Sequence, residues 1–242
     1  MDEPKDYPTP WREVWSLWRH IGLGTRADCL RLYQGIAAHL DPSPVARGLE
    51  RLPASPRFVL AANHHEREGL WIAYPAAALA VIIGGHYGLQ PPPLRWVVTA
   101  NFPRWQVGPW RIPSPGDLLL PRVAHAVYSY PVAFAKTNPA FSARSLRRLL
   151  RDARALECPL GLFPEGVAGK AGRPAAPLPG VERLLVHLAR LGLPVQPVAI
   201  SERPGLEFDF GDPIAPSELV AAPHAGQLVM ERICLFGRFQ KT

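Results

Sequence analysis

Beyond Pro56, short apolar runs alternate with stretches in which apolar residues recur at a helical period. These stretches predict two amphipathic helices, with apolar faces within 146–153 and 181–191. Strands separated by helical crossovers predict an α/β fold, with a largely parallel central sheet flanked by helices. Ligand sites in such folds lie beyond the carboxyl ends of the strands. The predicted strands are Arg57–Ala62, Leu94–Thr99, Pro131–Ala135, Leu160–Phe163, Val195–Ile200 and Leu206–Phe210.

The first 54 residues carry a different pattern, which predicts two helices. Trp11, Trp15 and Trp18 fall on one face of the first helix, with Arg12 and Arg19 between them. Such a face either packs on the domain core, the commoner outcome for an isolated stripe, or lies in a membrane interface. The patterns together predict a helical hairpin over 1–54 and an α/β domain over 55–242.

One long stretch, residues 69–94, contains no Asp, Glu, Lys or Arg. Its apolar part is interrupted by Pro75, closed by Gly84-Gly85, and lies at the short limit for a helix that spans a bilayer. We therefore expect a buried or membrane-facing helix here rather than a transmembrane span.

Composition supports a folded globular chain, with 242 residues, 48% hydrophobic and 19% charged. Three scattered cysteines without a CxxC pair argue against a disulfide framework and a thiolate zinc site, and the acidic N-terminus shows no secretory signal. The formal net charge is +7, and between Arg95 and Arg154 ten Lys and Arg stand against two acids. This local excess indicates an anionic partner, such as a lipid surface or a phosphate-bearing molecule.

Two polar clusters directly follow predicted strands. The first is the run NHHERE at 63–68, and the second is FPEG at 163–166. A metal site is disfavoured in the first cluster, because the second histidine of a His-Glu-x-x-His pattern would fall on Gly69. His64 instead suits a general base with a carboxylate a few residues on, and His65, Glu66 and Arg67 are assigned to loop or surface roles.

These clusters resemble motifs of the glycerolipid (1-acylglycerol-3-phosphate, PlsC-like) acyltransferases over about residues 55–215. The resemblance implies that His64 deprotonates a hydroxyl of a lipid acceptor for attack on an acyl thioester. Acyl-CoA or acyl carrier protein would be the co-substrate, with no other cofactor and no metal. The residues implied to form the substrate site are Asn63, Phe163, Pro164, Glu165 and Gly166.

Some positions depart from the family pattern. The aspartate expected five residues after the histidine falls on Gly69, so Glu68 is predicted to orient His64 in its place. The phosphate-binding arginines are missing, and Lys136 and Lys170 are predicted to act there as point charges.

The leading prediction is therefore an acyltransferase of lipid metabolism, such as phospholipid biosynthesis. It would be peripheral or monotopic on the cytoplasmic side of the membrane, with Trp11, Trp15 and Trp18 against the bilayer. Its predicted partners are the membrane surface, the lipid acceptor and the acyl donor. Nucleic acid is not expected, because no recognised module is present. The missing aspartate keeps open an alternative, a catalytically degenerate protein of this fold that binds lipid or acyl chains.

Overall fold

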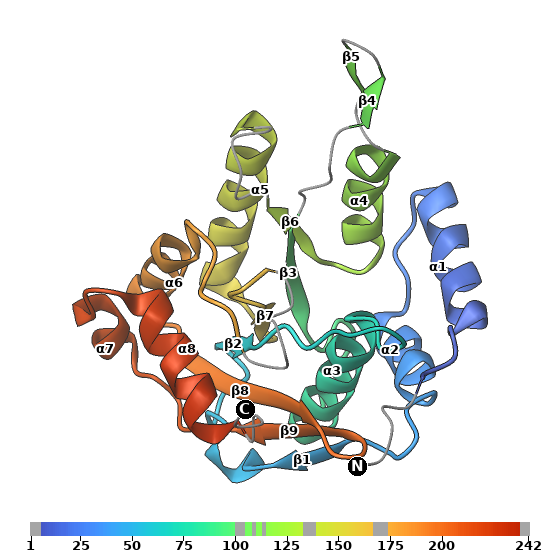
Figure 1. Ribbon diagram of the computed structural model, residues 1–242. Helices are drawn as coiled ribbons and strands as arrows, with labels where there is room; N and C mark the ends of the chain where they lie inside the picture. The colour runs from blue at the N-terminus through green and yellow to red at the C-terminus, as the bar shows by residue number, and fades with distance from the viewer. Residues whose placement is uncertain are drawn as a thin grey trace.

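The computed structural model describes residues 6–99, 105–107, 110–112, 115–132, 139–166 and 174–237. Its centre is a seven-stranded sheet in the order β1-β9-β8-β2-β7-β3-β6 (Figure 1). Only the β8–β9 pair is antiparallel, so the carboxyl ends of β8, β2, β7, β3 and β6 meet at one edge. The strands of this sheet are β1 (Val45–Arg47), β2 (Val59–Ala62), β3 (Arg95–Thr99), β6 (Tyr130–Val132), β7 (Leu160–Leu162), β8 (Val195–Glu202) and β9 (Leu206–Phe210).

All six predicted strands are present, which confirms the largely parallel α/β fold. Strand β8 runs two residues beyond its predicted end, and residues 133–135 of the predicted third strand lie outside the described part of the chain. Three further strands were not predicted: β1, and a hairpin formed by β4 (Trp105–Val107) and β5 (Trp110–Ile112). Strand β1 is short and partly exposed, so it has no apolar alternation. It is held to β9 by Arg47, which donates to both carboxylate oxygens of Glu207 at 2.9 Å.

Helices cover both faces of the sheet (Figure 1). Alternate residues of each strand point to opposite faces, which divides the core into two hydrophobic clusters. The first cluster packs under α2 and α3, and the second packs under α5, α6 and α8. The helices are α1 (Trp11–Leu23), α2 (Cys29–Ala37), α3 (Ala73–Tyr87), α4 (Pro115–Ala126), α5 (Pro139–Asp152), α6 (Val181–Arg190), α7 (Pro216–Ala221) and α8 (Ala225–Phe236), with 3₁₀ turns at Leu49–Arg51 and Ala153–Ala155.

Helix α3 is the element formed by the uncharged stretch. It begins at Ala73, ends at Tyr87, and buries most of its surface against α2 and the sheet. The expectation of a buried helix is therefore confirmed. None of the helices in the described ranges is both long enough and apolar enough to cross a membrane.

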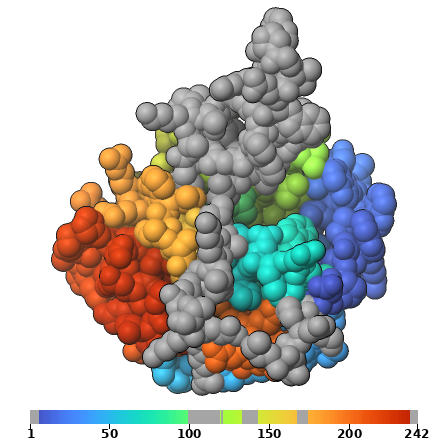
Figure 2. All heavy atoms as spheres, in the orientation of Figure 1, coloured from blue at the N-terminus to red at the C-terminus, as the bar shows by residue number. Residues whose placement is uncertain are grey.

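The tryptophan stripe of α1 faces solvent. Trp11, Trp15 and Trp18 are 62%, 68% and 44% exposed, whereas Ile21, in the last turn of the helix, is buried. Figure 2 shows α1 along the outer flank of the molecule. The stripe therefore does not pack on the core, which was the commoner expectation for an isolated aromatic face.

The predicted boundary at residue 54 does not separate two cores. Residues of α2, among them Leu32 and Ile36, belong to the same hydrophobic cluster as Leu60 and Phe208 of the sheet. Strand β1, also inside the first region, completes one edge of the sheet. The N-terminal helices are thus part of a single packed unit with the strands.

Candidate functional site

Three neighbouring strands deliver ionisable side chains to the same edge of the sheet. His64 lies two residues after β2, Glu165 lies three residues after β7, and Glu202 is the last residue of β8. Because β8, β2 and β7 are adjacent and parallel, the two clusters distant in sequence meet beyond their carboxyl ends.

Glu165 joins the two clusters. Its side chain is 1% exposed, and one carboxylate oxygen accepts the backbone N–H of His64 at 2.8 Å. The other oxygen accepts the backbone N–H of Ala175. Burial raises the pKa of Glu165 to about 6, although both N–H groups favour the ionised form. The carboxylate thus holds the main chain at His64, and neither oxygen is left without a partner.

The turn that carries Glu165 is closed by backbone hydrogen bonds. Gly166 N–H donates to the carbonyl of Phe163 at 3.1 Å, and Leu178 N–H donates to the carbonyl of Pro164 at 2.9 Å. Pro164 and Gly166 therefore shape the turn. Their contact with a substrate, inferred from the family resemblance, stays a prediction.

Aromatic rings pack against and beneath the His64 imidazole. The ring of Phe163 meets it edge to face at a centroid distance of 5.4 Å, and Phe163 stacks flat on Trp96 at 4.7 Å. Trp96 in turn lies over Gly161, where a Cβ atom would come within 2.5 Å of the indole ring. Gly161 is needed for this close approach, so a packed column runs from the middle of β7 to the histidine.

His64 has the properties of a neutral base. Burial lowers its pKa below the ordinary value for histidine, so the ring is uncharged at neutral pH. Among the residues that the structure describes, Nδ1 is buried without a hydrogen-bond partner, and the carboxylate that approaches it, at 3.8 Å, belongs to Glu66.

Glu68 does not occupy the place predicted for it. Its side chain is exposed, and within the described residues it makes no contact with His64. Glu66 lies nearer, with a carboxylate oxygen 3.8 Å from Nδ1 of His64, and its side chain is exposed, in line with the surface role given to it. The orienting role predicted for Glu68 is not supported by any ion pair with His64 among the described residues. In a turn directly after a strand, sequence spacing alone does not determine which of two nearby carboxylates faces back toward the histidine.

The backbone at position 69 disfavours the missing aspartate. Gly69 adopts a φ of +76°, a conformation that residues with a side chain rarely adopt. A Cβ atom there would lie 1.8 Å from the Oδ1 atom of Asp6. The glycine is therefore required by the local backbone and by the N-terminal segment packed against it.

Arg67 is an internal anchor rather than a surface residue. Its guanidinium donates to both carboxylate oxygens of Glu202, at 2.8 and 2.6 Å. Tyr7 donates to Glu202 at 3.4 Å, and His65 lies 3.7 Å from it. Burial alone would raise the pKa of Glu202, but the nearby His65 ring and the hydrogen bonds and charge of Arg67 outweigh it and bring the pKa to about 2.

Asn63 is a structural clamp. Its side-chain amide donates to the carbonyl of Ile200 at 3.0 Å and accepts the N–H of the same residue at 2.6 Å. These two bonds extend the β2–β8 ladder by one step after the strand pairing ends at Ala62 and Val198. The substrate contact implied for Asn63 stays a prediction.

Two predicted residues, Lys136 and Lys170, lie outside the described residues. In the part of the chain that the structure describes, no three His, Cys, Asp or Glu side chains gather in a group able to hold a metal ion.

Comparison with solved structures finds the same architecture. The crystal structure of the 1-acyl-sn-glycerophosphate (LPA) acyltransferase PlsC from Thermotoga maritima aligns with 97% of this chain, and the alignment covers 85% of the PlsC chain. The sequence identity is 15% and the TM-score is 0.50. The chain shares the PlsC fold. No family model and no curated protein matches the sequence.

The PlsC fold was predicted from sequence motifs, but Glu202 and its partners were not. A signal existed, because Glu202 is an acidic residue two positions beyond a predicted strand that ends at the same edge as His64. Its partner Arg67 was assigned to the surface because charged residues in a loop usually are.

The packed column of Gly161, Trp96 and Phe163 beneath His64 predicts an effect of substitution on stability. Gly161→Ala should lower the free energy of unfolding by about 1–3 kcal/mol, because the new methyl group collides with a buried, rigid indole ring. Gly85→Ala is the matched control. It lies in α3 with nothing within 4 Å, so it should be neutral or stabilising by up to about 1 kcal/mol. Urea unfolding measures both changes, and equal stabilities would refute the close packing.

The depressed pKa of Glu202 predicts how the free energy of unfolding depends on pH. Because its pKa is depressed to about 2 in the folded protein, its contribution of about 3 kcal/mol is present above the unfolded pKa near 4.5 and is lost as pH falls toward 2. Glu202→Gln should therefore be destabilising at pH 7 and progressively less so below pH 4.5. Glu218→Gln, which removes an exposed pair with Arg232, should change little at any pH. Unfolding free energies measured from pH 7 to pH 3 test this, and a pH-independent effect at Glu202 would contradict it.

Proposed function

We propose that the protein is an acyltransferase that moves a fatty acyl group from an acyl thioester to a hydroxyl of a lipid acceptor. The observation that carries the proposal is the position of His64. It is a half-buried, neutral imidazole beyond the carboxyl end of a central strand, fixed through its own backbone by the buried Glu165. The shared fold with a lipid acyltransferase supports the reaction class.

In the proposed reaction, the Nε2 atom of His64 takes the proton from the acceptor hydroxyl as the oxygen attacks the thioester carbonyl. The carbon–sulfur bond then breaks, and the leaving thiolate receives that proton from the imidazolium. Glu66 stabilises the transient positive charge through Nδ1, which lies 3.8 Å from its carboxylate in the free protein. Glu165 acts as a positioning residue, because both of its oxygens are engaged by backbone N–H groups.

The proposed acyl donor is acyl-CoA or acyl carrier protein, and the proposed acceptor is a lipid alcohol at a membrane surface. The exposed tryptophan face of α1 supports membrane docking, because apolar aromatic side chains on a helix with basic neighbours suit the bilayer interface. The N-terminal segment also supports it, since Tyr7 N–H donates to the carbonyl of Gly69 at 2.9 Å and so ties the start of α1 to the loop after His64.

A second candidate is a non-catalytic protein that binds lipid or acyl chains. It is favoured by Gly69, whose left-handed backbone disfavours the expected aspartate. The two candidates differ in one measurement, the formation of acylated lipid.

For the reaction, we predict that His64→Ala lowers the rate of acyl transfer at least about 100-fold, as expected for loss of a general base. Glu66→Gln should lower the rate less, and Glu68→Gln should remain near the wild-type rate as the matched control. The assay incubates purified protein with acyl-CoA and a panel of lipid alcohols and measures products by mass spectrometry. An active His64→Ala protein would exclude the base role, and a wild type that binds acyl-CoA without product would support the second candidate.

For membrane docking, we predict that replacing Trp11, Trp15 and Trp18 together by Ala reduces liposome binding at least about tenfold. Each indole buries enough apolar area to contribute more than about 1 kcal/mol. Leu235→Ala, at a 73% exposed apolar position on α8, is the control and should bind as the wild type does. Flotation with phospholipid liposomes measures the bound fraction. Undiminished flotation of the triple variant would rule out α1 as the docking element.

A further inference from the structure

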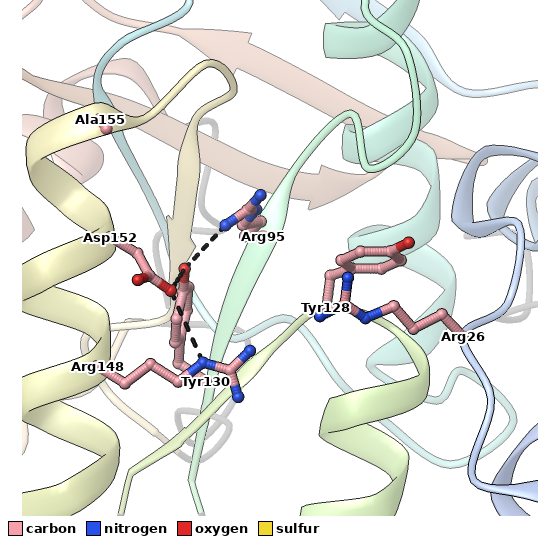
Figure 3. Close-up of a pocket in the computed structure, with 7 residues that line it drawn as sticks. All are labelled: Arg26, Arg95, Tyr128, Tyr130, Arg148, Asp152 and Ala155. Carbon is pink, nitrogen blue, oxygen red and sulfur yellow. Dashed lines mark hydrogen bonds and ion pairs between the residues drawn. The ribbon is translucent and has the colours of Figure 1, made fainter.

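A cavity lies at the opposite edge of the sheet from His64. It has a volume of about 300 Å³ and opens beside the first residues of β3 and β6, Arg95 and Tyr130. Figure 3 shows Arg95, Tyr130, Asp152 and Arg148 on one side, and Tyr128 with Arg26 on the other. These side chains come from the α1–α2 connection, the starts of two strands, the end of α4 and the last turn of α5, so the fold assembles the cavity from distant segments.

The positive charge of this cavity is not neutralised from within. Three arginines and one aspartate line it, which leaves two positive charges. Asp152 is already shared, since it accepts the Tyr130 hydroxyl at 3.1 Å and lies 3.7 Å from Arg148 and 3.3 Å from Arg151.

The other two arginines keep donors free. Arg95 donates to the Tyr130 oxygen at 3.1 Å, and its Nε atom is buried with no hydrogen-bond partner among the described residues. Arg26 forms no ion pair with any residue that the structure describes, and its guanidinium lies 4.4 Å above the centre of the Tyr128 ring. A buried unpaired N–H is costly unless a ligand satisfies it.

Tyr128 adds an independent sign of function. Among the described residues it is the one non-glycine with a left-handed backbone, at a φ of 56°. It stands one residue after the helix cap of α4, where Ser129 N–H donates to the carbonyl of Ala124 and Tyr128 N–H donates to that of His125. Glycine is the usual residue at this position of a helix-ending motif, and another residue costs about 1 kcal/mol. Tyr128 therefore has a strained backbone conformation, and the Arg26 guanidinium lies over its ring.

The position of Arg26 is also fixed. The next residue, Ala27, donates its backbone N–H to the carbonyl of Ala126 at 2.9 Å, which ties the α1–α2 connection to the end of α4. Arg26 and Tyr128 therefore line one side of the cavity in a fixed arrangement.

We propose that this cavity binds the phosphate group of a phosphomonoester. A phosphate dianion matches the two uncompensated charges, and guanidinium groups bind its oxygens through paired N–H donors. The phosphate would be carried either by a soluble ester or by a lipid headgroup. The site is distinct from the His64 site, and the proposal does not depend on acyl transfer.

The first test measures binding of inorganic phosphate and glycerol 3-phosphate by titration calorimetry. Arg26→Gln and Arg95→Gln should each weaken binding at least about tenfold, the loss expected for one charged hydrogen-bonding group. Arg183→Gln on α6, exposed and outside the cavity, is the matched control and should bind as the wild type does. Circular dichroism melting shows that each variant is folded.

A second arm distinguishes the two sources of phosphate. Phosphatidylcholine vesicles containing phosphatidic acid are compared with vesicles given the same surface charge by phosphatidylglycerol, whose phosphate is a diester. Preference for phosphatidic acid that Arg26→Gln abolishes would assign a lipid headgroup, whereas binding of the soluble esters alone would assign a soluble ligand. The proposal would be overturned if neither the soluble phosphates nor the phosphatidic acid vesicles bind. It would also be overturned if Arg26→Gln and Arg95→Gln leave the binding unchanged.

Tyr128→Gly gives a readout that a purely structural role would not produce. Relief of the left-handed backbone offsets part of the core packing that is lost with the ring, while loss of the ring beneath Arg26 should weaken phosphate binding. A variant with unchanged phosphate affinity would overturn the role assigned to Tyr128.

Discussion

The arrangement of the whole site depends on the carboxylate of Glu165. It is almost fully removed from water, and no ion pair with it is present among the described residues. A buried carboxylate in that position is tolerable only because the N–H groups of His64 and Ala175 occupy one oxygen each. The dependence is mutual, since each N–H would otherwise lack its partner. One side chain therefore sets the path of the chain after β2, of the turn after β7, and of the segment that enters α6.

A second, partly buried carboxylate, Glu202, extends this network to the N-terminal segment. Arg67 binds it through two hydrogen bonds, and Tyr7 reaches it from the segment that precedes α1. The Tyr7 ring also packs against Tyr74 at the start of α3, and the Tyr74 hydroxyl donates to the carbonyl of Pro8. The exposed tryptophan helix is thus attached directly to the loop that carries His64.

The sequence was sufficient for six strands of the sheet and for placing the clusters of His64 and Glu165 directly after strands, because buried strands leave apolar runs and parallel strands end at one edge. It was not sufficient for details decided by geometry. Whether Glu66 or Glu68 approaches His64 depends on one turn, and Gly69 is explained by its left-handed backbone and by Asp6 packed against it. Strand β1 was missed because its pairing rests on the ion pair between Arg47 and Glu207, which leaves no periodic signal.

The fold places two arginines of the basic segment 95–154 beside one cavity. Arg95 and Arg148 belong to this segment, and both line the cavity at the amino edge of the sheet, together with Arg26 from outside the segment. The carboxyl edge, in contrast, holds the buried carboxylate Glu165 and the partly buried carboxylate Glu202. Opposite charges are therefore separated along the strand direction, with the hydrophobic core between them. Such a separation keeps the carboxylate network from neutralising the arginines, so the positive charge at the amino edge stays available to an external anion.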